Sequence, residues 1–204
     1  MSVERDLDAW QAWTPAELHA RVHGLEVPWA VAAGWAIDLF VGGEPREHED
    51  LENAVARDSF PAICRALPEL EWFGAGGIDG VEEKIWPIDE APEELYQTWG
   101  WDAQAECWRL DVFREPWEGE TWVCRRDPAI RRPVADAIES TADGIPYLAP
   151  EIVLLFKAKH AQRERDQHDL ARALPRLDGA RRRWLADAVR LVHPGHDWIE
   201  VVEP

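Results

Sequence analysis

Two acidic residues, Asp50 and Glu52, lie one residue apart in a segment with the pattern of a short β-strand. Alternate side chains of a strand share a face, so these two carboxylates are expected to project together. Like charges this close raise each other's pKa, and a cation bound between them removes the repulsion. Carboxylate oxygens are the ligands that Mg²⁺ and Mn²⁺ prefer. The spacing indicates a divalent-metal site, while a solvated acidic edge strand is the alternative.

A third carboxylate, Asp111, lies in the later segment 107–115, which also alternates like a strand. The alternation puts Leu110 and Val112 on one face and Asp111 on the other. An acidic residue in so apolar a strand is costly unless it is paired or metal-bound. If this strand lies beside the one holding Asp50 and Glu52, three carboxylates converge, which is what two-metal phosphoryl transfer requires.

Gly34 stands where a short apolar run, expected to be a strand, meets a short helix that Gly42 and Gly43 end. A glycine turn between a strand and a helix exposes backbone N–H groups that suit a phosphate. Such turns are common, so Gly34 gains meaning only together with the carboxylates.

The remaining elements must position these residues. Thr14, Pro15 and Glu17 form a capping-box signature that predicts a helix over 14–22. Residues 87–106 are expected to be irregular and acidic, and from Pro146 the pattern becomes helical. The predicted helices are 14–22, 35–41, 58–67, 149–162, 163–174 and 178–193, and the predicted strands are 28–33, 50–55, 71–77, 81–86, 107–115 and 121–126. Mixed elements followed by helices alone predict an α+β fold, with domains at 1–140 and 141–204.

The charge distribution narrows the range of partners. The 204 residues carry a net charge of −18, and residues 1–100 hold 21 acidic and 6 basic side chains. This acidic half disfavours nucleic acid and suits a small cationic molecule, although solubility alone would also explain it. The acidic loop 87–106, with Glu82 and Glu83, is a candidate for binding ammonium groups.

The sequence predicts a cytoplasmic protein. No run of 18 apolar residues and no signal peptide is seen, so no membrane association is expected. The three cysteines form no CxxC pair and are interpreted as reduced structural thiols. Most of the thirteen tryptophans, including Trp86, Trp99, Trp101 and Trp108, are expected in the core or at a domain interface, with one or two available to stack on a base or sugar.

In this order, the pieces resemble the nucleotidyltransferase superfamily, whose fold is polymerase-β-like. The resemblance rests on "AAGWAIDLFVGGEPREHEDLENAV", on "LDVF" and on "PYLAPEIVLLFKAKHAQRERDQHDL", and it covers roughly residues 27–170. The nearest likeness is to aminoglycoside 2″-adenylyltransferases. It implies a small mixed sheet flanked by helices, with a helical C-terminal part. Ala33–Gly34 differs from the usual Gly-Gly or Gly-Ser, since alanine adopts positive φ less readily.

The resemblance also implies roles for particular residues. Asp50 and Glu52 would be shared by two Mg²⁺ ions, and Asp111 would bind one ion and act as general base. Gly34 would lie against the triphosphate of ATP. Arg46 and His48 lie just upstream of the acidic pair and could reach phosphate oxygens, and the alternative is that they are polar surface residues. The resemblance further implies that a lysine, Lys157 or Lys159, neutralises the triphosphate.

The two lysines are two residues apart on a helix and point about 200° from each other, so one faces the site, and Lys157 is favoured. Arg163, Arg165 and Asp166 match the family's Arg-x-Lys-Asp run, and Asp166 is expected to orient basic groups.

The implied activity is Mg²⁺-dependent transfer of a nucleoside monophosphate, AMP from ATP, to a hydroxyl of a small and possibly cationic acceptor such as an aminoglycoside. The alternative is a binding or interaction protein of the same fold, such as a toxin–antitoxin component, in which the carboxylates do not assemble. A protein acceptor is a third hypothesis. The acceptor, the nucleotide base and the oligomeric state are not specified by the sequence.

Overall fold

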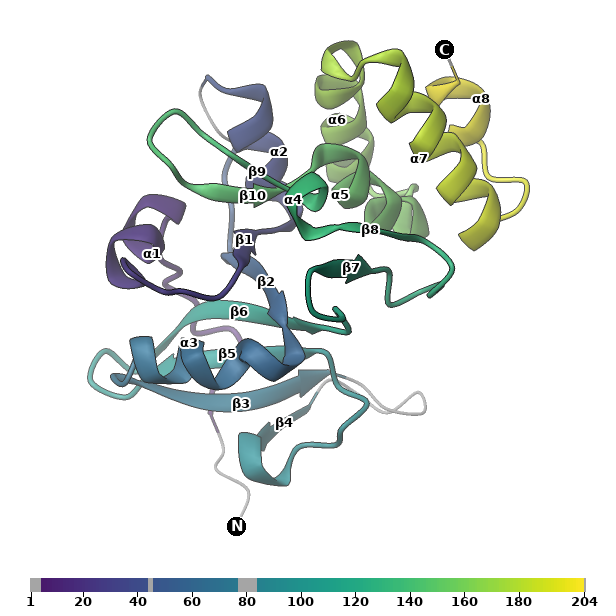
Figure 1. The fold of residues 1–204 in the computed structure, drawn as a ribbon. Coiled ribbons are helices and arrows are strands. Elements are labelled where there is room, and N and C mark those ends of the chain that lie inside the picture. Colours follow the sequence, from purple (N-terminus) through teal and green to yellow (C-terminus); the bar gives the residue numbers. More distant parts are fainter. Residues whose placement is uncertain (1–4, 44–45, 77–83, 204) are drawn as a thin grey trace. The chain divides into compact units, whose positions relative to one another are not determined.

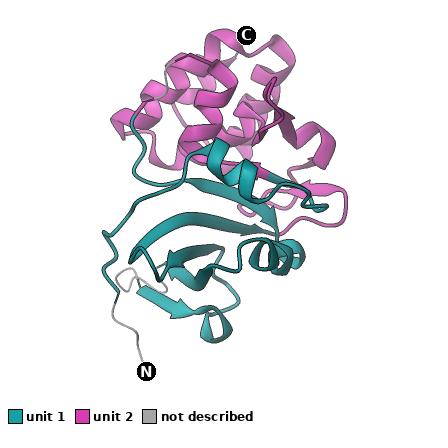
Figure 2. Cartoon of the chain, turned by 90° about the vertical axis from the view of Figure 1, so that its left-hand side faces the viewer, with its two compact units in different colours: residues 1–29, 47–115 teal, residues 30–46, 116–204 magenta. Residues whose placement is uncertain are grey.

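The computed structural model describes residues 5–43, 46–76 and 84–203 (Figure 1). The chain forms two compact units that alternate along the sequence (Figure 2). Unit 1 comprises residues 1–29 and 47–115, and unit 2 comprises residues 30–46 and 116–204. The division at residue 140 stays a prediction. No helix in the described ranges is long and apolar enough to cross a membrane.

Unit 1 is built on a mixed sheet whose strand order is β4-β3-β5-β6-β2. Strands β4, β3, β5 and β6 pair antiparallel in turn, whereas β6 and β2 are parallel. The strands are β2 (Glu52–Ala56), β3 (Leu70–Gly76), β4 (Lys84–Pro87), β5 (Gln97–Asp102) and β6 (Cys107–Glu115). The predicted strand over 107–115 is confirmed in full, and the strand predicted from Asp50 begins two residues later, at Glu52.

The helices of unit 1 lie within the segments that the sequence predicts, but Ser59, the residue before the second one, makes no capping hydrogen bond with its side chain. Helix α1 (Pro15–Arg21) has the predicted capping box, since the Thr14 hydroxyl accepts from the Glu17 N–H and the Glu17 carboxylate accepts from the Thr14 N–H. Helix α3 (Phe60–Ala66) follows the 3₁₀ turn η1 (Arg57–Ser59) and contacts the sheet through the edge of the Phe60 ring on Trp72.

An aromatic cluster fills one face of the unit 1 sheet. Trp108 is fully buried and lies 4.8 Å from Trp101 and 5.3 Å from Trp99, measured between ring centroids. Phe73 and the half-buried Trp10 close the cluster. Nine of the thirteen tryptophans are buried, which confirms that most of them are core residues.

The expectation that residues 87–106 are irregular is wrong. After the 3₁₀ turn η2 (Ile88–Glu90), strand β5 occupies Gln97–Asp102 and pairs with β3 and β6. Gly100 obscured the pattern, because glycine interrupts a strand signal. The structure shows why glycine is there: a Cβ at Gly100 would lie 2.8 Å from the Leu70 side chain and 3.1 Å from Trp72.

Unit 2 combines short strands with most of the helices. Strand β10 (Pro146–Leu148) pairs parallel with β1 (Trp29–Val31) and antiparallel with β9 (Ile138–Ser140). A separate hairpin joins β7 (Thr121–Val123) and β8 (Arg131–Pro133). The sequence missed β8, β9 and β10, and the expectation of helix directly from Pro146 is wrong, because these three-residue strands are too short to show a period.

Helix α5 lies at the centre of unit 2 and contacts α2, α6 and α7. The helices and 3₁₀ turns of this unit are α2 (Ala33–Val41), α4 (Val134–Ala137), α5 (Pro150–Lys157), η3 (Ala158–His160), α6 (Glu164–Ala173), η4 (Leu174–Arg176), α7 (Gly179–Val192) and α8 (Trp198–Val202). Two predicted helix ends are confirmed: Gly42 ends α2 at φ 70°, and the Asp178 side chain accepts from the Arg181 N–H at the start of α7.

Candidate functional site

Glu52 and Asp111 lie opposite each other on two neighbouring strands. Strands β2 and β6 are parallel neighbours, and Glu52 is in register with Asp111. The backbone N–H of Asp111 donates to the Leu51 carbonyl at 2.9 Å, which fixes this register at the start of β2. Paired residues of neighbouring strands point to the same face, so two acidic side chains share one face of the unit 1 sheet.

Asp111 is almost fully buried, with 3% of its surface exposed. Its Oδ2 accepts a hydrogen bond of 2.8 Å from the Gln97 side-chain amide on β5. Trp99 is the β5 residue in register with Asp111, so the carboxylate lies between Glu52 on one strand and an aromatic ring on the other. An amide N–H can only donate, so this contact uses one lone pair of Oδ2 and orients the carboxylate.

Asp50 and His48 lie on the half-buried segment that leads into β2. Asp50 precedes the strand by two residues, so the alternation that was expected to align it with Glu52 starts after it. Over the described ranges, no group of three or more His, Cys, Asp or Glu side chains is arranged to hold a metal ion. Strand register thus brings Glu52 and Asp111 together, and the participation of Asp50 stays a prediction. Glu82 and Glu83 lie outside the described residues.

Gly34 is buried in the first turn of α2 in unit 2. Within the described chain no side chain caps this helix, and its first turn contains no acidic residue. Its first N–H groups are therefore suited to an anion. Ala33 has φ 47°, the left-handed conformation that glycine adopts most readily. Ala33 adopts this conformation at a cost of roughly 1–2 kcal/mol.

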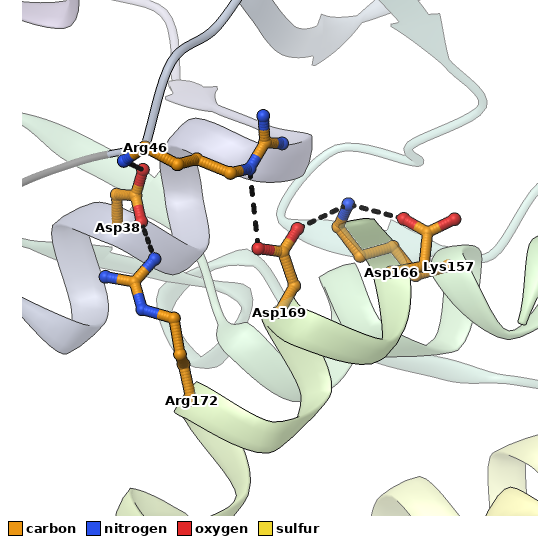
Figure 3. A network of polar contacts seen from close by, with 6 residues as sticks. All are labelled: Asp38, Arg46, Lys157, Asp166, Asp169 and Arg172. Carbon is orange, nitrogen blue, oxygen red and sulfur yellow. Dashed lines mark hydrogen bonds and ion pairs between the residues drawn. The ribbon is translucent and has the colours of Figure 1, made fainter. Parts of the chain in front are cut away.

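The predicted phosphate-binding residues Arg46 and Lys157 belong to one polar network in unit 2 (Figure 3). Lys157 Nζ lies 2.8 Å from Asp166 Oδ1 and 2.8 Å from Asp169 Oδ2. Asp169 Oδ1 in turn lies 3.5 Å from Arg46 Nε. Asp169 has no exposed surface, and Asp166 has 3% exposed. Such burial is tolerable because each carboxylate is paired with a cation.

Asp38 on α2 extends this network. It accepts a hydrogen bond of 3.1 Å from the Arg46 backbone N–H and pairs with the Arg172 guanidinium of α6. Three carboxylates and three cations therefore meet around α2, α5 and α6.

The two lysines at the end of α5 have different surroundings. Lys157 joins the network, whereas Lys159 on η3 is exposed. Next to Lys159, burial lowers the pKa of His160 below its ordinary value, and the charges of Arg163, Lys159 and Arg126 lower it further. The end of α5 is thus an electropositive region in a strongly acidic chain.

Sequence reasoning missed four residues of these two clusters: Gln97, Asp38, Asp169 and Arg172. A signal existed for α6, because Asp166, Asp169 and Arg172 recur every three residues and therefore share one helix face. Asp38 is the one acidic residue in the apolar helix sequence "AGWAIDLFV", and such a pattern indicates a buried charge that is paired. Gln97 had no local signal, since its contact depends on β5.

Comparison with known proteins gives one family match. The family described as Aminoglycoside-2''-adenylyltransferase matches residues 16–73. This range includes Gly34, Asp50 and Glu52 but ends before Asp111. No curated protein matches the chain.

Solved structures match most of the chain. The solution structure of the antibiotic-resistance factor ANT(2'')-Ia has a TM-score of 0.55 at 15% identity and covers 86% of this chain and 89% of its own. The crystal structure of ANT(2'')-Ia in complex with adenylyl-2''-tobramycin has a TM-score of 0.55 at 14% identity, covering 85% of this chain and 93% of its own. The lincomycin-bound lincosamide antibiotic adenylyltransferase LnuA has a TM-score of 0.52 at 15% identity, covering 77% and 92%. At these low identities, the three structural similarities show that the chain shares the fold of these proteins.

Proposed function

We propose that this chain, which has the nucleotidyltransferase fold, is an enzyme that transfers AMP from ATP to a hydroxyl of a small antibiotic-like acceptor, with Mg²⁺ as cofactor. The observation that carries the proposal is the register of Glu52 with Asp111 on neighbouring parallel strands. The structural similarity to two antibiotic adenylyltransferases supports the same activity.

The donor set fits Mg²⁺ in its chemistry, because all of its atoms are carboxylate oxygens. Glu52 and Asp111 would hold the ions from the sheet, and Asp50 would join them from the segment before β2. When bound, the ions neutralise phosphate charge and lower the pKa of the acceptor hydroxyl.

In this proposal Asp111 is the general base. It accepts the proton of the acceptor hydroxyl, whose oxygen forms a bond to the α-phosphorus of ATP. The bond between that phosphorus and the oxygen bridging to the β-phosphate breaks, and pyrophosphate leaves with the electron pair. Gln97 keeps Asp111 ready for this role by donating to its carboxylate.

Unit 2 supplies the groups proposed for the triphosphate. The N–H groups of the first turn of α2, at Gly34, are suited to phosphate oxygens. Arg46 and Lys157 add positive charge, and His48 and Lys159 are further candidates. An arginine and a lysine complement each other here, since the first presents a planar fork and the second a point charge.

The charge of unit 1 supports a cationic acceptor. Its 98 residues carry 23 acidic and 7 basic side chains, a balance of −16. Such a surface attracts cations and repels polyanions, which favours an aminoglycoside-like amine over tRNA.

A turnover assay tests the proposal. The purified protein is incubated with ATP and Mg²⁺ and with a panel of aminoglycosides, lincosamides and uncharged polyols, while pyrophosphate release and product mass are measured. We expect an acceptor that gains one AMP unit, only with Mg²⁺ present. The matched control is Asp111→Asn, and GTP, CTP and UTP establish the choice of base. If the panel yields no product and ATP does not bind, the enzymatic proposal is wrong.

The alternative is a binding or interaction protein of the same fold with a weak or absent catalytic site. That alternative predicts ATP or partner binding without turnover, and no loss of function in Asp111→Asn.

A further inference from the structure

We propose that Asp169 is a positioning residue that holds Lys157 and Arg46 in the geometry in which they bind the nucleotide triphosphate. This inference rests on the proposed function and deepens it. Figure 3 shows the arrangement on which it depends: the Asp169 carboxylate lies between the two cations, with one oxygen toward each.

The first argument is electrostatic. Lys157 comes from the end of α5 and Arg46 from the segment after α2, far apart in sequence. Two cations directed at one phosphate group repel each other in the absence of ligand. Asp169 removes this repulsion because Oδ2 lies 2.8 Å from Lys157 and Oδ1 lies 3.5 Å from Arg46. Its complete burial keeps the interaction in a low dielectric, where it is strongest.

The second argument concerns the donors of Lys157. An ammonium group has three N–H donors. The group donates a hydrogen bond of 2.8 Å to Asp166 Oδ1, and Asp169 Oδ2 lies at the same distance from Nζ as an ion-pair partner. Two carboxylates of α6 therefore hold the ammonium group, and N–H donors remain for a phosphate oxygen. Lys157 is thereby held in place rather than being a mobile charge, which suits a phosphate-binding group.

The third argument is that the frame around Asp169 is itself fixed. Asp166, Asp169 and Arg172 lie on one face of α6, three residues apart. Arg172 pairs with Asp38, and Asp38 accepts from the Arg46 backbone N–H at 3.1 Å. Arg46 is therefore held twice, once by its backbone and once by its side chain.

The experiment compares three aspartates that differ in how many of the two cations they contact. Asp169→Asn removes the charge that contacts both cations, and Asp166→Asn removes a charge that contacts Lys157. Asp187→Asn, on the surface of α7, removes a charge that pairs with Arg190. The affinities for ATP, tripolyphosphate and adenosine are measured for each by competition with a fluorescent ATP analogue, and folding is checked by thermal unfolding.

We expect Asp169→Asn to weaken ATP and tripolyphosphate binding by roughly 10- to 100-fold, the range found when the partner that orients a binding group is lost. Asp166→Asn should have a smaller effect and Asp187→Asn none. Adenosine affinity should stay unchanged in all three variants, because adenosine has no phosphate group for Lys157 and Arg46 to bind. A merely structural defect would instead weaken adenosine and ATP binding alike.

Equal losses for adenosine and ATP, or unchanged ATP affinity in folded Asp169→Asn, would overturn the inference while leaving the proposed function intact. Failure of the wild-type protein to bind ATP at all would instead defeat the proposed function. Asp169→Glu decides the case if Asp169→Asn does not fold. This variant retains the charge but displaces it by one methylene, so it should fold and yet bind ATP more weakly than the wild type. An ATP affinity equal to that of the wild type would also overturn the inference.

Discussion

The carboxylates of the two units are compensated in different ways. In unit 1, Glu52 and Asp111 are neighbours of like charge, and Asp111 accepts from the neutral amide of Gln97. In unit 2, Asp166 and Asp169 are fully or almost fully buried and pair with Lys157. The net charges of the two units differ as well. Unit 1 has a net charge of −16, whereas unit 2, with 17 acidic and 15 basic residues, has a net charge of −2.

This difference separates two uses of the same residue type. Removing the cation from a buried ion pair leaves an uncompensated charge in the interior, which costs about 3–5 kcal/mol. Two carboxylates that strand register brings together are a candidate site for a cation, which would offset their like charge. The unit 1 pair is therefore expected to matter for activity and the unit 2 network for stability as well as for nucleotide binding.

The largest expected effect is on activity in unit 1. Asp111→Asn should lower kcat by roughly 10²- to 10⁴-fold, the usual contribution of a general base. Its melting temperature is measured as well, so that a loss of kcat can be separated from a loss of folding. Steady-state kinetics with the acceptor found in the turnover assay, together with thermal unfolding, check both parts. A destabilised variant with unchanged kcat would show that Asp111 is a structural residue and would erase the contrast between the units.

The next effect is on stability in unit 2. Lys157→Met should lower the free energy of unfolding by about 3–5 kcal/mol, because it leaves Asp166 and Asp169 buried without their shared cation. Urea unfolding followed by circular dichroism measures this loss. The double variant Lys157→Met/Asp166→Asn is the control, and it should be more stable than Lys157→Met alone. Additive losses in the double variant would mean that the ion pair contributes little.

A smaller effect is expected at Gln97. Gln97→Leu should weaken Mn²⁺ binding by roughly 10- to 100-fold, because the amide orients one oxygen of Asp111. The matched control is Gln104→Leu, whose side chain is exposed in the turn after β5. Titration followed by electron paramagnetic resonance reports free Mn²⁺ without requiring turnover. Equal Mn²⁺ affinities in the two variants would remove Gln97 from the site.

The smallest effect is expected for a partly exposed ion pair. Burial opposes ionisation of Asp102, but the Ala105 N–H, the Arg109 guanidinium and the Gln104 N–H together hold its pKa below the ordinary value of 3.8. A lowered pKa in the folded state stabilises the fold at neutral pH, and this contribution is lost as the pH falls through that pKa.

Asp102→Asn should therefore cost at most about 1 kcal/mol at pH 7, the range for partly exposed ion pairs. The free energy of unfolding, measured from pH 7 downward, should show a difference from wild type that starts to shrink near pH 4. The difference should be gone once the pH lies below the lowered pKa of Asp102 in the folded state. A difference that persists at lower pH would show that the Asp102 side chain contributes by packing and not by its charge.

The sequence by itself determined the chemistry and the local elements that carry it. The apolar alternation around Asp111 and the capping residues Thr14 and Asp178 act over a few residues, so their consequences for local structure can be predicted from the sequence alone. The α+β class and the resemblance to adenylyltransferases followed from the order of such segments, and the fold agrees.

Only the tertiary structure decided which residues meet. The register of Glu52 with Asp111 depends on β2 and β6 being neighbours. Gln97 contacts Asp111 because it lies on β5, a strand that the sequence did not predict because Gly100 interrupts its pattern. The network around Asp169 joins α2, α5 and α6, with residues separated by up to 134 positions in sequence. Local periodicity carries no information on such pairings, because they depend on long-range packing between elements and on the energy of burying charges together.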